Sequence, residues 1–543
     1  MVCGVTAQFK PASWRNLLSG GPNNVYGKGV WDGDSLFILD GVLHGFKVVD
    51  PGADISPYYT PNYASAIDKS GEQMNIIIQD ELLSGKLSIV KEKPQCVHAL
   101  GAVPKPNGSI RPITDASRPK FMSINNYMNQ TFNHFKYNSM DDVCAFLKPN
   151  CYLSVSDISA AYRSVLTRAH DRKFQGLKWG ADEKDEFMVD NFLSFGARAS
   201  AFIFNRLTDS VSRYINACGY ICINYLDDFL IMGQSYKECQ SGQLLLHETL
   251  RSLGFYIAYN KVSSPSRVQI YLGIEIDTIN MKLRLPKGKL QKLHTELSFF
   301  NGRTKATRKQ LQRLCGVLSH CTTVVKGGRT FSRRVIDLLC DFSDNKRYIN
   351  LNQSFFSDLE WWQSFANWFN GEARVLDGQS HPSRTLTSDA SDSGWGILCG
   401  DDWAAGLWQS DIVISSDSHH HCVAPTKSVD KTHHISVREL YPILEALDRW
   451  GPIWKNCRVT CETDNTQVVS AVNSGRTSNL KAMTILREIF WKTVIWNCQL
   501  VAVHLPGVLN HRADYLSRLS NKMSFIPDFD VCCSGGIVEV FPG

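Results

Sequence analysis

The stretch Tyr225-Leu226-Asp227-Asp228 decides the fold, because it places two adjacent carboxylates between two apolar runs. The runs 220–225 and 229–233 on either side are both strand-like. The pattern predicts a β-hairpin with the acids near its tip. Carboxylates this close repel each other unless a cation neutralises them, and a pair of Mg²⁺ ions is the usual solution where phosphates react. An acidic surface turn is the plain alternative.

A third acid favours the metal site over the surface turn. Residues 151–157 form another alternating run, which ends at Asp157, and Tyr162 follows five residues later. Carboxylates from different strands can converge on two metals about 3.5–4 Å apart, as phosphoryl transfer requires. We expect Asp157 and Asp227 to be the bridging ligands. Asp228 is then the weaker ligand or an electrostatic support.

Two further motifs suit a nucleotide triphosphate. Residues 103–115 contain a Pro-Asn-Gly turn between two short strands, which presents Lys105 and Arg111 on a hairpin. Cations there could clamp phosphates, although such a hairpin alone could be coincidental. After Leu193 the chain turns at Gly196 and continues as a helix. Gly196 permits close backbone approach to a base pair or sugar, and Phe195 could pack on the nucleotide or template.

Length and composition set the broad class. A chain of 543 residues is too long for one core, so several domains are expected. An apolar content of 43% and a charged content of 20% are ordinary for a folded protein. No apolar run reaches the roughly 18 residues of a membrane span. Seventeen cysteines without any Cys-x-x-Cys indicate reduced thiols and an intracellular location, cytoplasmic, nuclear or both.

One segment supplies the whole basic excess of the chain. Residues 281–334 hold fourteen Lys/Arg and a single acid, against a net charge of +6 for the whole chain. Leucines at helical spacing predict two amphipathic helices, the second capped near Thr307. Basic outer faces suit a duplex backbone, and a solvated basic face is the alternative. The residues expected to bind nucleic acid are Arg308, Lys309 and Arg313, with Leu272 and Gly273 of a preceding short hairpin suited to gripping a primer.

A second set of acids follows in another alternating region. Asp389 ends a strand, Glu439 lies in the first turns of a helix that Ser436 is expected to cap, and Asp464 ends a further strand. Asp514 supplies the last acid, and His504 precedes it by ten residues. The same two-metal logic applies, with water as the attacking group. Pro442 predicts either a kink or a late helix start.

At this point a resemblance becomes specific. The order Arg111…Asp115, Asp157-x4-Tyr162, Leu193-x-Phe-Gly196, Tyr225-Leu-Asp-Asp228, Leu272-Gly273 resembles retroelement reverse transcriptases, and the second set of acids resembles ribonuclease H domains. Residues 117–125 and 310–318 resemble the DIRS-like group, retrotransposons that use a tyrosine recombinase. Ser194 departs from the usual proline, which puts local helix placement in doubt but not the metal site.

The resemblance implies an α/β (α+β) multidomain fold, a right-hand polymerase of fingers, palm and thumb followed by a ribonuclease H-like domain. It implies two Mg²⁺ (or Mn²⁺) ions per active site, held by Asp157, Asp227 and Asp228 and by the four acids from Asp389 to Asp514. Tyr162 would lie under the incoming sugar and select deoxynucleotides, unless it is a core tyrosine. His504, on a mobile loop, would assist proton transfer or product release.

The partners implied are an RNA template, a DNA primer, an RNA–DNA hybrid and dNTPs, without a membrane. A tyrosine recombinase and a capsid-like protein would lie on other chains. Two alternatives are a decayed nucleic-acid-binding protein and a scaffold for a recombinase. The presence of all seven acids disfavours decay.

The expected domain boundaries are as follows: an N-terminal extension 1–74, fingers and palm 75–278, a basic helical thumb 279–345, a connection or linker 346–383, a ribonuclease H-like domain 384–520 and a tail 521–543. The tryptophan-rich stretch 358–368 is expected to pack in a core. The histidines and cysteine between His419 and His434 invite a zinc interpretation, but no second cysteine pairs with Cys422, so a solvated loop is preferred.

Overall fold

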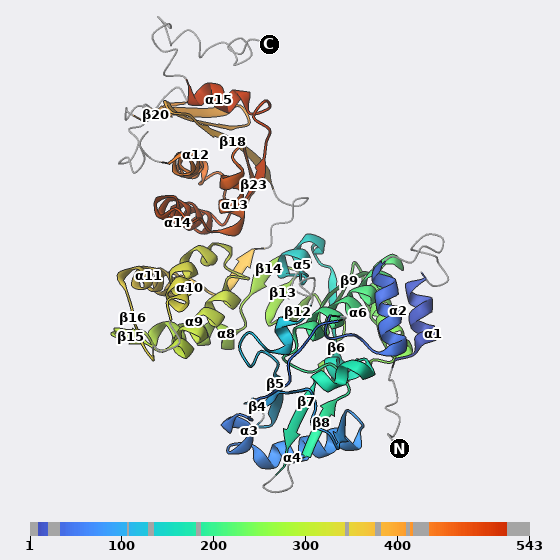
Figure 1. The fold of residues 1–543 in the computed structure, drawn as a ribbon. Coiled ribbons are helices and arrows are strands. Elements are labelled where there is room, and N and C mark those ends of the chain that lie inside the picture. Colours follow the sequence, from blue (N-terminus) through green and yellow to red (C-terminus); the bar gives the residue numbers. More distant parts are fainter. Residues whose placement is uncertain are drawn as a thin grey trace, which may run out of the picture. The chain divides into compact units, whose positions relative to one another are not determined.

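The protein has a mixed α/β fold of two compact units, residues 1–272 and 273–543, in a computed structural model (Figure 1). The two units are described separately. The residues that the structure describes are 9–19, 33–50, 52–105, 108–128, 135–180, 186–342, 347–374, 382–408, 413–415 and 434–518. The Pro106-Asn107 turn, the cluster 419–433 and the tail 521–543 therefore lie outside them.

The first unit is built around a four-stranded sheet in the order β11-β6-β10-β9. Its strands are β6 (Tyr152–Ser159), β9 (Ile221–Tyr225), β10 (Asp228–Gly233) and β11 (Tyr256–Ile257). The predicted hairpin of β9 and β10 is confirmed, with Tyr225 opposite Asp228. Two long helices, α6 (Arg198–Ala217) and α7 (Tyr236–Leu253), pack on this sheet. The sheet lies in the core of this unit, as shown by Phe229, Leu230 and Ile231, which are completely inaccessible to solvent.

A second layer of the same unit carries the predicted nucleotide hairpin. That hairpin, β4 (Ala99–Pro104) with β5 (Ile110–Asp115), is confirmed by its antiparallel register. A five-stranded sheet accompanies it in the order β1-β3-β7-β8-β2. Its strands are β1 (Tyr58–Tyr59), β2 (Leu87–Val90), β3 (Cys96–Val97), β7 (Gly176–Trp179) and β8 (Glu186–Asp190). Helices α3 (Ala64–Ile67) and α4 (Gly71–Leu83) complete it.

The N-terminal residues belong to the first unit and do not form a separate extension. Helices α1 (Pro11–Leu18) and α2 (Gly33–His44) pack against α6 and α7. Trp14 is fully buried, and its indole N–H donates to the carbonyl of Leu253 at 3.2 Å. The expected boundary at residue 74 is wrong in this respect, since it also falls inside α4. These short helices have no long periodic pattern, so the sequence alone gave no signal for them.

The helical part of the second unit agrees with the amphipathic prediction. Helices α8 (Lys287–Ser298) and α9 (Arg308–Cys321) bury all but one of the predicted leucines, and Leu290 is only half-buried. Thr307 caps α9 through a capping box with Gln310. Next come η8 (Lys326–Ser332), α10 (Arg333–Cys340) and α11 (Gln353–Trp368). Trp362 and Phe365 of α11 are buried, which confirms the packing interpretation.

The predicted linker is only partly a linker. Strand β17 (Glu372–Arg374) pairs with β14 (Lys282–Arg284), which in turn pairs with β13 (Ile274–Asp277). Glu372 joins both Lys282, at 2.5 Å, and Arg284, at 2.9 Å. Strand β17 is held by charged side chains on β14, although Arg284 and Glu372 are 88 residues apart in the sequence. No local sequence pattern predicts such a pairing.

The remainder of the second unit is a six-stranded sheet in the order β21-β20-β19-β18-β22-β23 (Figure 1). Its strands are β18 (Ser383–Ala390), β19 (Gly394–Cys399), β20 (Asp402–Leu407), β21 (Val413–Ser415), β22 (Arg458–Thr463) and β23 (Gln499–His504). Its helices are α12 (Ile435–Trp450), α13 (Thr466–Ser474), α14 (Leu480–Ile495) and α15 (His511–Ser517). The pairs β18–β22 and β22–β23 are parallel, and the other pairs are antiparallel.

Helix α12 begins earlier than predicted. His434, not Ser436, is its N-cap, and the ring of His434 accepts the backbone N–H of Ser436. Pro442 lies inside the helix, so the late start is wrong. The apolar face of Leu440, Leu444 and Leu447 is buried as predicted.

No helix among the described residues is long and apolar enough to cross a membrane. None of the cysteines within the described ranges forms a disulfide.

Replacing Trp14 with alanine should destabilise the protein by about 3–5 kcal/mol, because it empties a large core site. It also removes one of two donors to the Leu253 carbonyl, which keeps the backbone N–H of Lys10. Urea unfolding followed by circular dichroism measures the change. Arg15→Ala, at an exposed position of the same helix, is the matched control and should stay near wild type. A loss below about 1 kcal/mol for Trp14→Ala would mean that α1 is dispensable.

Candidate active sites

The three acids of the first unit meet where β6 and β10 pair. Asp228 lies directly opposite Asp157 in the antiparallel register, and Asp227 precedes it at the hairpin turn. Leu226 of that turn has a φ of 51°. Backbone hydrogen bonds fix the position, since the N–H of Ile158 donates to the Asp227 carbonyl at 3.1 Å. The structure thus brings together the acids that the sequence singled out.

These carboxyls are partly desolvated and influence one another. Asp157 is 5% exposed. Burial, together with the nearby Asp227 and Asp157 carboxylates, raises the pKa of Asp228 to about 7. The pKa of Asp227 is also raised, chiefly by burial and then by Asp157, while Lys261 and Arg111 oppose the shift. A site with this charge distribution favours a cation, and its oxygen ligands fit a hard divalent ion.

Two residues outside the predicted metal ligands hold the acids in place. The Nζ of Lys261 donates to Oδ2 of Asp157 at 2.7 Å. The hydroxyl of Tyr271, which is buried at the end of β12 (Val268–Tyr271), donates to the Asp228 carbonyl at 3.2 Å. Lys261 therefore neutralises part of the charge of Asp157, and Tyr271 helps to fix the backbone at Asp228.

The predicted sugar and base contacts lie together. The ring centroids of Tyr162 and Phe195 are 5.0 Å apart, and both side chains are half-buried. Gly196 has a φ of 111°, and a Cβ there would come within 1.8 Å of the Thr114 carbonyl oxygen. The glycine therefore lets the turn pack against β5, the strand that carries Arg111. Lys105 and Arg111 are exposed at the end of the β4–β5 hairpin.

The primer-gripping pair lies at a turn between β12 and β13. Leu272 has a φ of 50° and Gly273 a φ of 74°, the left-handed conformation of a tight turn. Arg308 and Lys309 are exposed in the first turn of α9. Arg313 instead pairs with the buried Glu296 of α8 at 2.7 Å. The role of these residues in binding nucleic acid remains a prediction. Of the three cations, Arg313 fits it least well, because its charge is already paired with Glu296.

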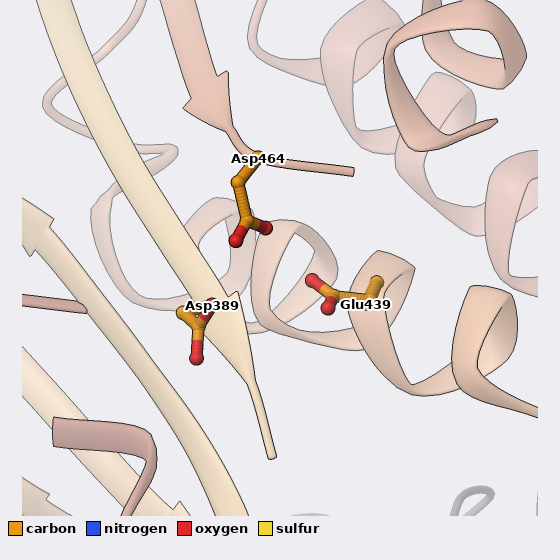
Figure 2. A group of neighbouring side chains, drawn as sticks. All are labelled: Asp389, Glu439 and Asp464. Atoms are coloured by element: carbon orange, nitrogen blue, oxygen red, sulfur yellow. The ribbon is translucent and has the colours of Figure 1, made fainter. Parts of the chain in front are cut away.

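Three acids of the second unit form a compact group (Figure 2). Asp389 comes from β18, Glu439 from α12, and Asp464 directly follows β22. Each offers a carboxylate oxygen, and these atoms lie within 4.8 Å of one another. Among the described residues, this group of acids has carboxylate oxygens close enough together to hold one metal ion. The three acids of the first unit do not meet the same distance criterion.

The electrostatics of this group also call for a cation. Burial, together with the charges of Asp389 and Asp464, raises the pKa of Glu439 to about 9. Burial is also the main cause that raises the pKa of Asp389 to about 6, a shift that the hydrogen bond from the Ser517 hydroxyl opposes. Oε2 of Glu439 is buried without a hydrogen-bond partner among the described residues. The donor set therefore fits a divalent ion, whose charge would satisfy these oxygens.

The fourth acid, Asp514, stands outside the compact group. It lies on α15, and its Oδ1 accepts a hydrogen bond from Arg518 Nε at 2.6 Å. Its charge nevertheless raises the pKa of Asp389, after burial and Asp464. His504 is the last residue of β23 and pairs with Thr463, so the expectation that it lies on a loop is wrong. Strand β23 extends one residue past its alternating run because β22 supplies the partner.

Other side chains of the second unit hold the acids in place. Ser517, which sequence reasoning missed, donates to Oδ2 of Asp389 at 2.7 Å, and Asn510 donates to the other oxygen at 3.3 Å. Arg438, which is nearly buried, donates to the Ser391 carbonyl at 2.9 Å. Ser517 follows Asp514 by three residues on one short helix, a spacing that could have indicated a shared face.

Comparison with known proteins agrees with this geometry. Residues 103–276 match the family described as reverse transcriptase (RNA-dependent DNA polymerase). The enzymatic polyproteins of Cauliflower mosaic virus, strains Strasbourg and D/H, are each 21% identical over 346 residues, 62% of this chain and 46% of theirs. The chain therefore spans less than half the length of these relatives.

Two solved structures share the fold. The foamy viral protease-reverse transcriptase in complex with dsDNA is 14% identical with a TM-score of 0.50, and the match covers 92% of this chain and 98% of that one. The same protein with an RNA/DNA hybrid gives 14% and 0.50, over 91% and 62%.

Two acids at a hairpin tip thus face a third acid on the adjoining strand, within a fold that is similar to a solved protease-reverse transcriptase structure. Residues 103–276 form a reverse transcriptase domain of the retroelement and retroviral type.

Without divalent ions, the stability of the wild-type protein should fall as the pH rises above about 5. The pKa of Glu439 in the folded state is about 9, above its value of about 4.3 in an unfolded chain. The folded state therefore binds the proton more tightly, and stability declines by up to about 1.4 kcal/mol per pH unit between these values. Glu439→Gln removes this decline and should be the more stable protein at pH 8.5 in a chelator.

Thermal unfolding at pH 5 and 8.5, with and without Mg²⁺, measures this effect. Excess Mg²⁺ should reverse the order, since glutamine provides no charge for the ion. Glu462→Gln, a half-buried position two residues before Asp464, is the control. Equal stability of Glu439→Gln and wild type at pH 8.5 in chelator would contradict the raised pKa.

Proposed function

We propose that this chain is an RNA- and DNA-templated DNA polymerase, a reverse transcriptase, with ribonuclease H activity on the RNA strand of RNA–DNA hybrids, serving retrotransposon replication. One observation carries the proposal: Asp157 and Asp228 are direct cross-strand partners, next to Asp227, inside the segment that matches reverse transcriptases. The substrates would be a primed RNA or DNA template and dNTPs.

The polymerase site would use its residues in distinct roles. Asp157, Asp227 and Asp228 would hold two Mg²⁺ (or Mn²⁺) ions. When bound, such ions neutralise the carboxylates, lower the pKa of the attacking hydroxyl and balance charge on the leaving oxygen. Lys105 and Arg111 would clamp the triphosphate.

The other contacts would position primer and sugar. Tyr162, against Phe195, would exclude a ribose 2′-hydroxyl, and Gly196 would let the backbone approach the base pair. Leu272 and Gly273 would hold the primer strand near its 3′ end.

The second unit would cleave RNA in the hybrid. Asp389, Glu439 and Asp464 support this, because their oxygens already lie within 4.8 Å of one another on three different elements. Asp514 would complete the set of ligands, again for two metal ions. His504 would assist proton transfer or product release from the end of β23. Asn510 and Ser517 would orient Asp389 through the hydrogen bonds described above.

The finer identity is also proposed. The stretches 117–125 and 310–318 resemble DIRS-like elements, which favours a partner tyrosine recombinase and a capsid-like protein on other chains. Two similar structures contain double-stranded DNA and an RNA/DNA hybrid, respectively. Those partners suit the basic helices α8 and α9. Replication of such an element would take place inside the cell, in the cytoplasm, the nucleus or both.

Asp227→Asn and Asp464→Asn should separate the two activities. Asp227→Asn should abolish primer extension on poly(rA)·oligo(dT) with Mg²⁺ and leave hybrid cleavage intact. Asp464→Asn should do the reverse on a labelled RNA–DNA hybrid and a DNA-templated extension. Each amide keeps the shape of the side chain but loses the charge that holds a cation, and salt screens that loss over about 8–10 Å.

Loss of both activities in either folded variant would contradict two independent sites. Synthesis at the wild-type rate by Asp227→Asn would remove the polymerase assignment altogether. Both variants should bind the hybrid as tightly as wild type does.

Reversing the charges of Arg308 and Lys309 to glutamate should weaken hybrid binding without sequence preference. Each lost phosphate contact lowers the slope of log K against log salt by about 0.9. Fluorescence anisotropy between 50 and 300 mM salt measures that slope. Reversal of Arg313, which pairs with Glu296, is the comparison and should change the slope less. An unchanged slope in the Arg308 and Lys309 variant would mean that both cations face solvent only.

A further inference from the structure

Arg163 is a buried cation directly beside the predicted sugar contact Tyr162. Both residues lie in the single 3₁₀ turn η4 (Ala161–Ser164). The Arg163 side chain is only 10% exposed. A guanidinium so deeply buried needs full pairing, because an isolated charge in that environment is costly.

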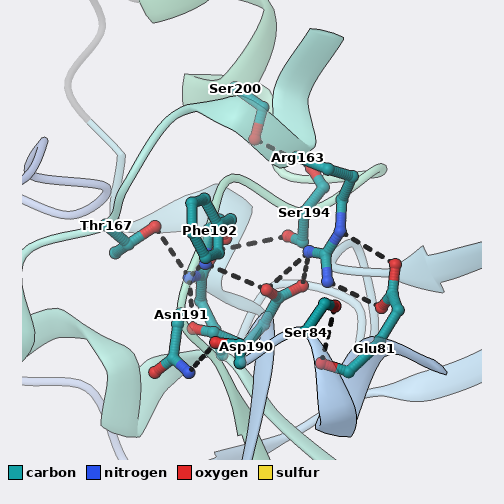
Figure 3. A network of polar contacts seen from close by, with 11 residues as sticks. Glu81, Ser84, Arg163, Thr167, Asp190, Asn191, Phe192, Ser194 and Ser200 are labelled. Carbon is teal, nitrogen blue, oxygen red and sulfur yellow. Dashed lines mark hydrogen bonds and ion pairs between the residues drawn. The ribbon is translucent and has the colours of Figure 1, made fainter. Parts of the chain in front are cut away.

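Two carboxylates from distant elements supply this pairing (Figure 3). Nη1 of Arg163 contacts both carboxylate oxygens of Asp190, at the end of β8, at 2.5 Å. On the other side, Nε and Nη2 contact Oε1 and Oε2 of Glu81, in α4, at 3.1 and 2.6 Å. The planar fork of arginine thus joins two elements to the turn that carries Tyr162, which a single ammonium cannot do in the same way.

The contacts of Asp190 continue to the turn that carries Phe195. Its Oδ1 accepts the backbone N–H of Phe192 at 3.0 Å. Gln175 donates to the Asp190 carbonyl at 3.1 Å and accepts the hydroxyl of Ser194 at 3.3 Å. Ser200 then donates to the Ser194 carbonyl at 2.8 Å. The hydrogen bonds that start at Arg163 therefore end at Ser194, the residue before Phe195.

Both walls of the proposed sugar site thus share one support. The rings of Tyr162 and Phe195 lie 5.0 Å apart. Arg163 follows Tyr162 directly in the sequence. It is connected to the turn that carries Phe195 through its contacts with Asp190. We propose that Arg163 is a positioning residue that fixes the spacing of Tyr162 and Phe195 and thereby sets the discrimination between deoxyribonucleotides and ribonucleotides. This inference rests on the proposed polymerase function.

The expected effect is selective because steric rejection of a hydroxyl depends on small distances. A shift of about 1 Å in a positioning group can cost about a hundredfold in rate. A looser Tyr162 would bind the correct sugar less well and reject the wrong one less strongly. The side chain of Arg163 pairs with Glu81 and Asp190 and not with the proposed metal ligands, so the chemical step should change little.

Arg163→Lys tests this inference in the full chain, because it keeps a cation between the carboxylates but loses the fork. Single-nucleotide insertion on a DNA template should show KM for dNTP raised and dNTP over rNTP discrimination lowered, each about tenfold, with kcat within about threefold. Arg168→Lys is the matched control. Its ion pair with Asp40 is at the surface, and all three quantities should stay at wild-type values.

A double variant distinguishes positioning from general destabilisation. Tyr162→Ala alone should admit ribonucleotides, and adding Arg163→Lys should lower discrimination no further if Arg163 acts through Tyr162. Additive losses would overturn the inference. So would wild-type discrimination in Arg163→Lys. A wild type without primer extension would overturn the proposed function itself, whereas an active wild type with an unchanged Arg163→Lys overturns this inference alone.

Two milder variants apply if Arg163→Lys does not fold. Asp190→Asn should lower discrimination, because Asp190 connects to the Phe195 turn. Glu81→Gln should leave discrimination near the wild-type value, since Glu81 lies on the other side of the guanidinium. Equal effects of the two variants, or no effect of Asp190→Asn, would overturn the proposal.

Discussion

Pairing of β10 with β6 is the constraint on which the first site depends. The register sets Asp228 opposite Asp157, and a slip of one residue would turn every side chain of β10 to the other face. Ile231 and Leu230 make such a slip costly, because both are completely buried. The burial of apolar side chains therefore overrides the repulsion between acids that the same register brings together.

The second unit reaches the same result with a different construction. Its acids come from two parallel strands and a helix, and the pairing of β18 with β22 brings the ends of the strands together. Burial of Glu439 and Asp389 destabilises their charged forms, as their raised pKa values indicate. At both sites, strand pairing holds the backbone that carries the acids, so the fold tolerates a poorly solvated group of carboxylates that a cation would stabilise.

Patterns among neighbouring residues were sufficient to predict the elements that local sequence determines. The alternation around Asp227, the glycine turn at Gly196 and the Thr307 cap each identified an element correctly, since neighbours in sequence determine them. Features that depend on distant partners were missed. Strand β17 forms through charges on β14, and α1 docks through Trp14 on a helix that ends 239 residues later. His434 caps α12 with a ring nitrogen, a role that propensity assigns to serine.

The four acids of the second unit also show that a sequence motif does not predict the burial or the hydrogen-bond partners of the residues in a site. Asp464 is exposed and Asp514 partly so, whereas Asp389 and Glu439 are each only 5% exposed. Ser517 and Asn510 hold both oxygens of Asp389, but Oε2 of Glu439 has no partner among the described residues. Hydrogen bonds therefore fix the carboxylate of Asp389, whereas one carboxylate oxygen of Glu439 lacks a hydrogen-bond partner among the described residues. A bound cation would contribute most at Glu439, because there it replaces no existing hydrogen bond to that oxygen.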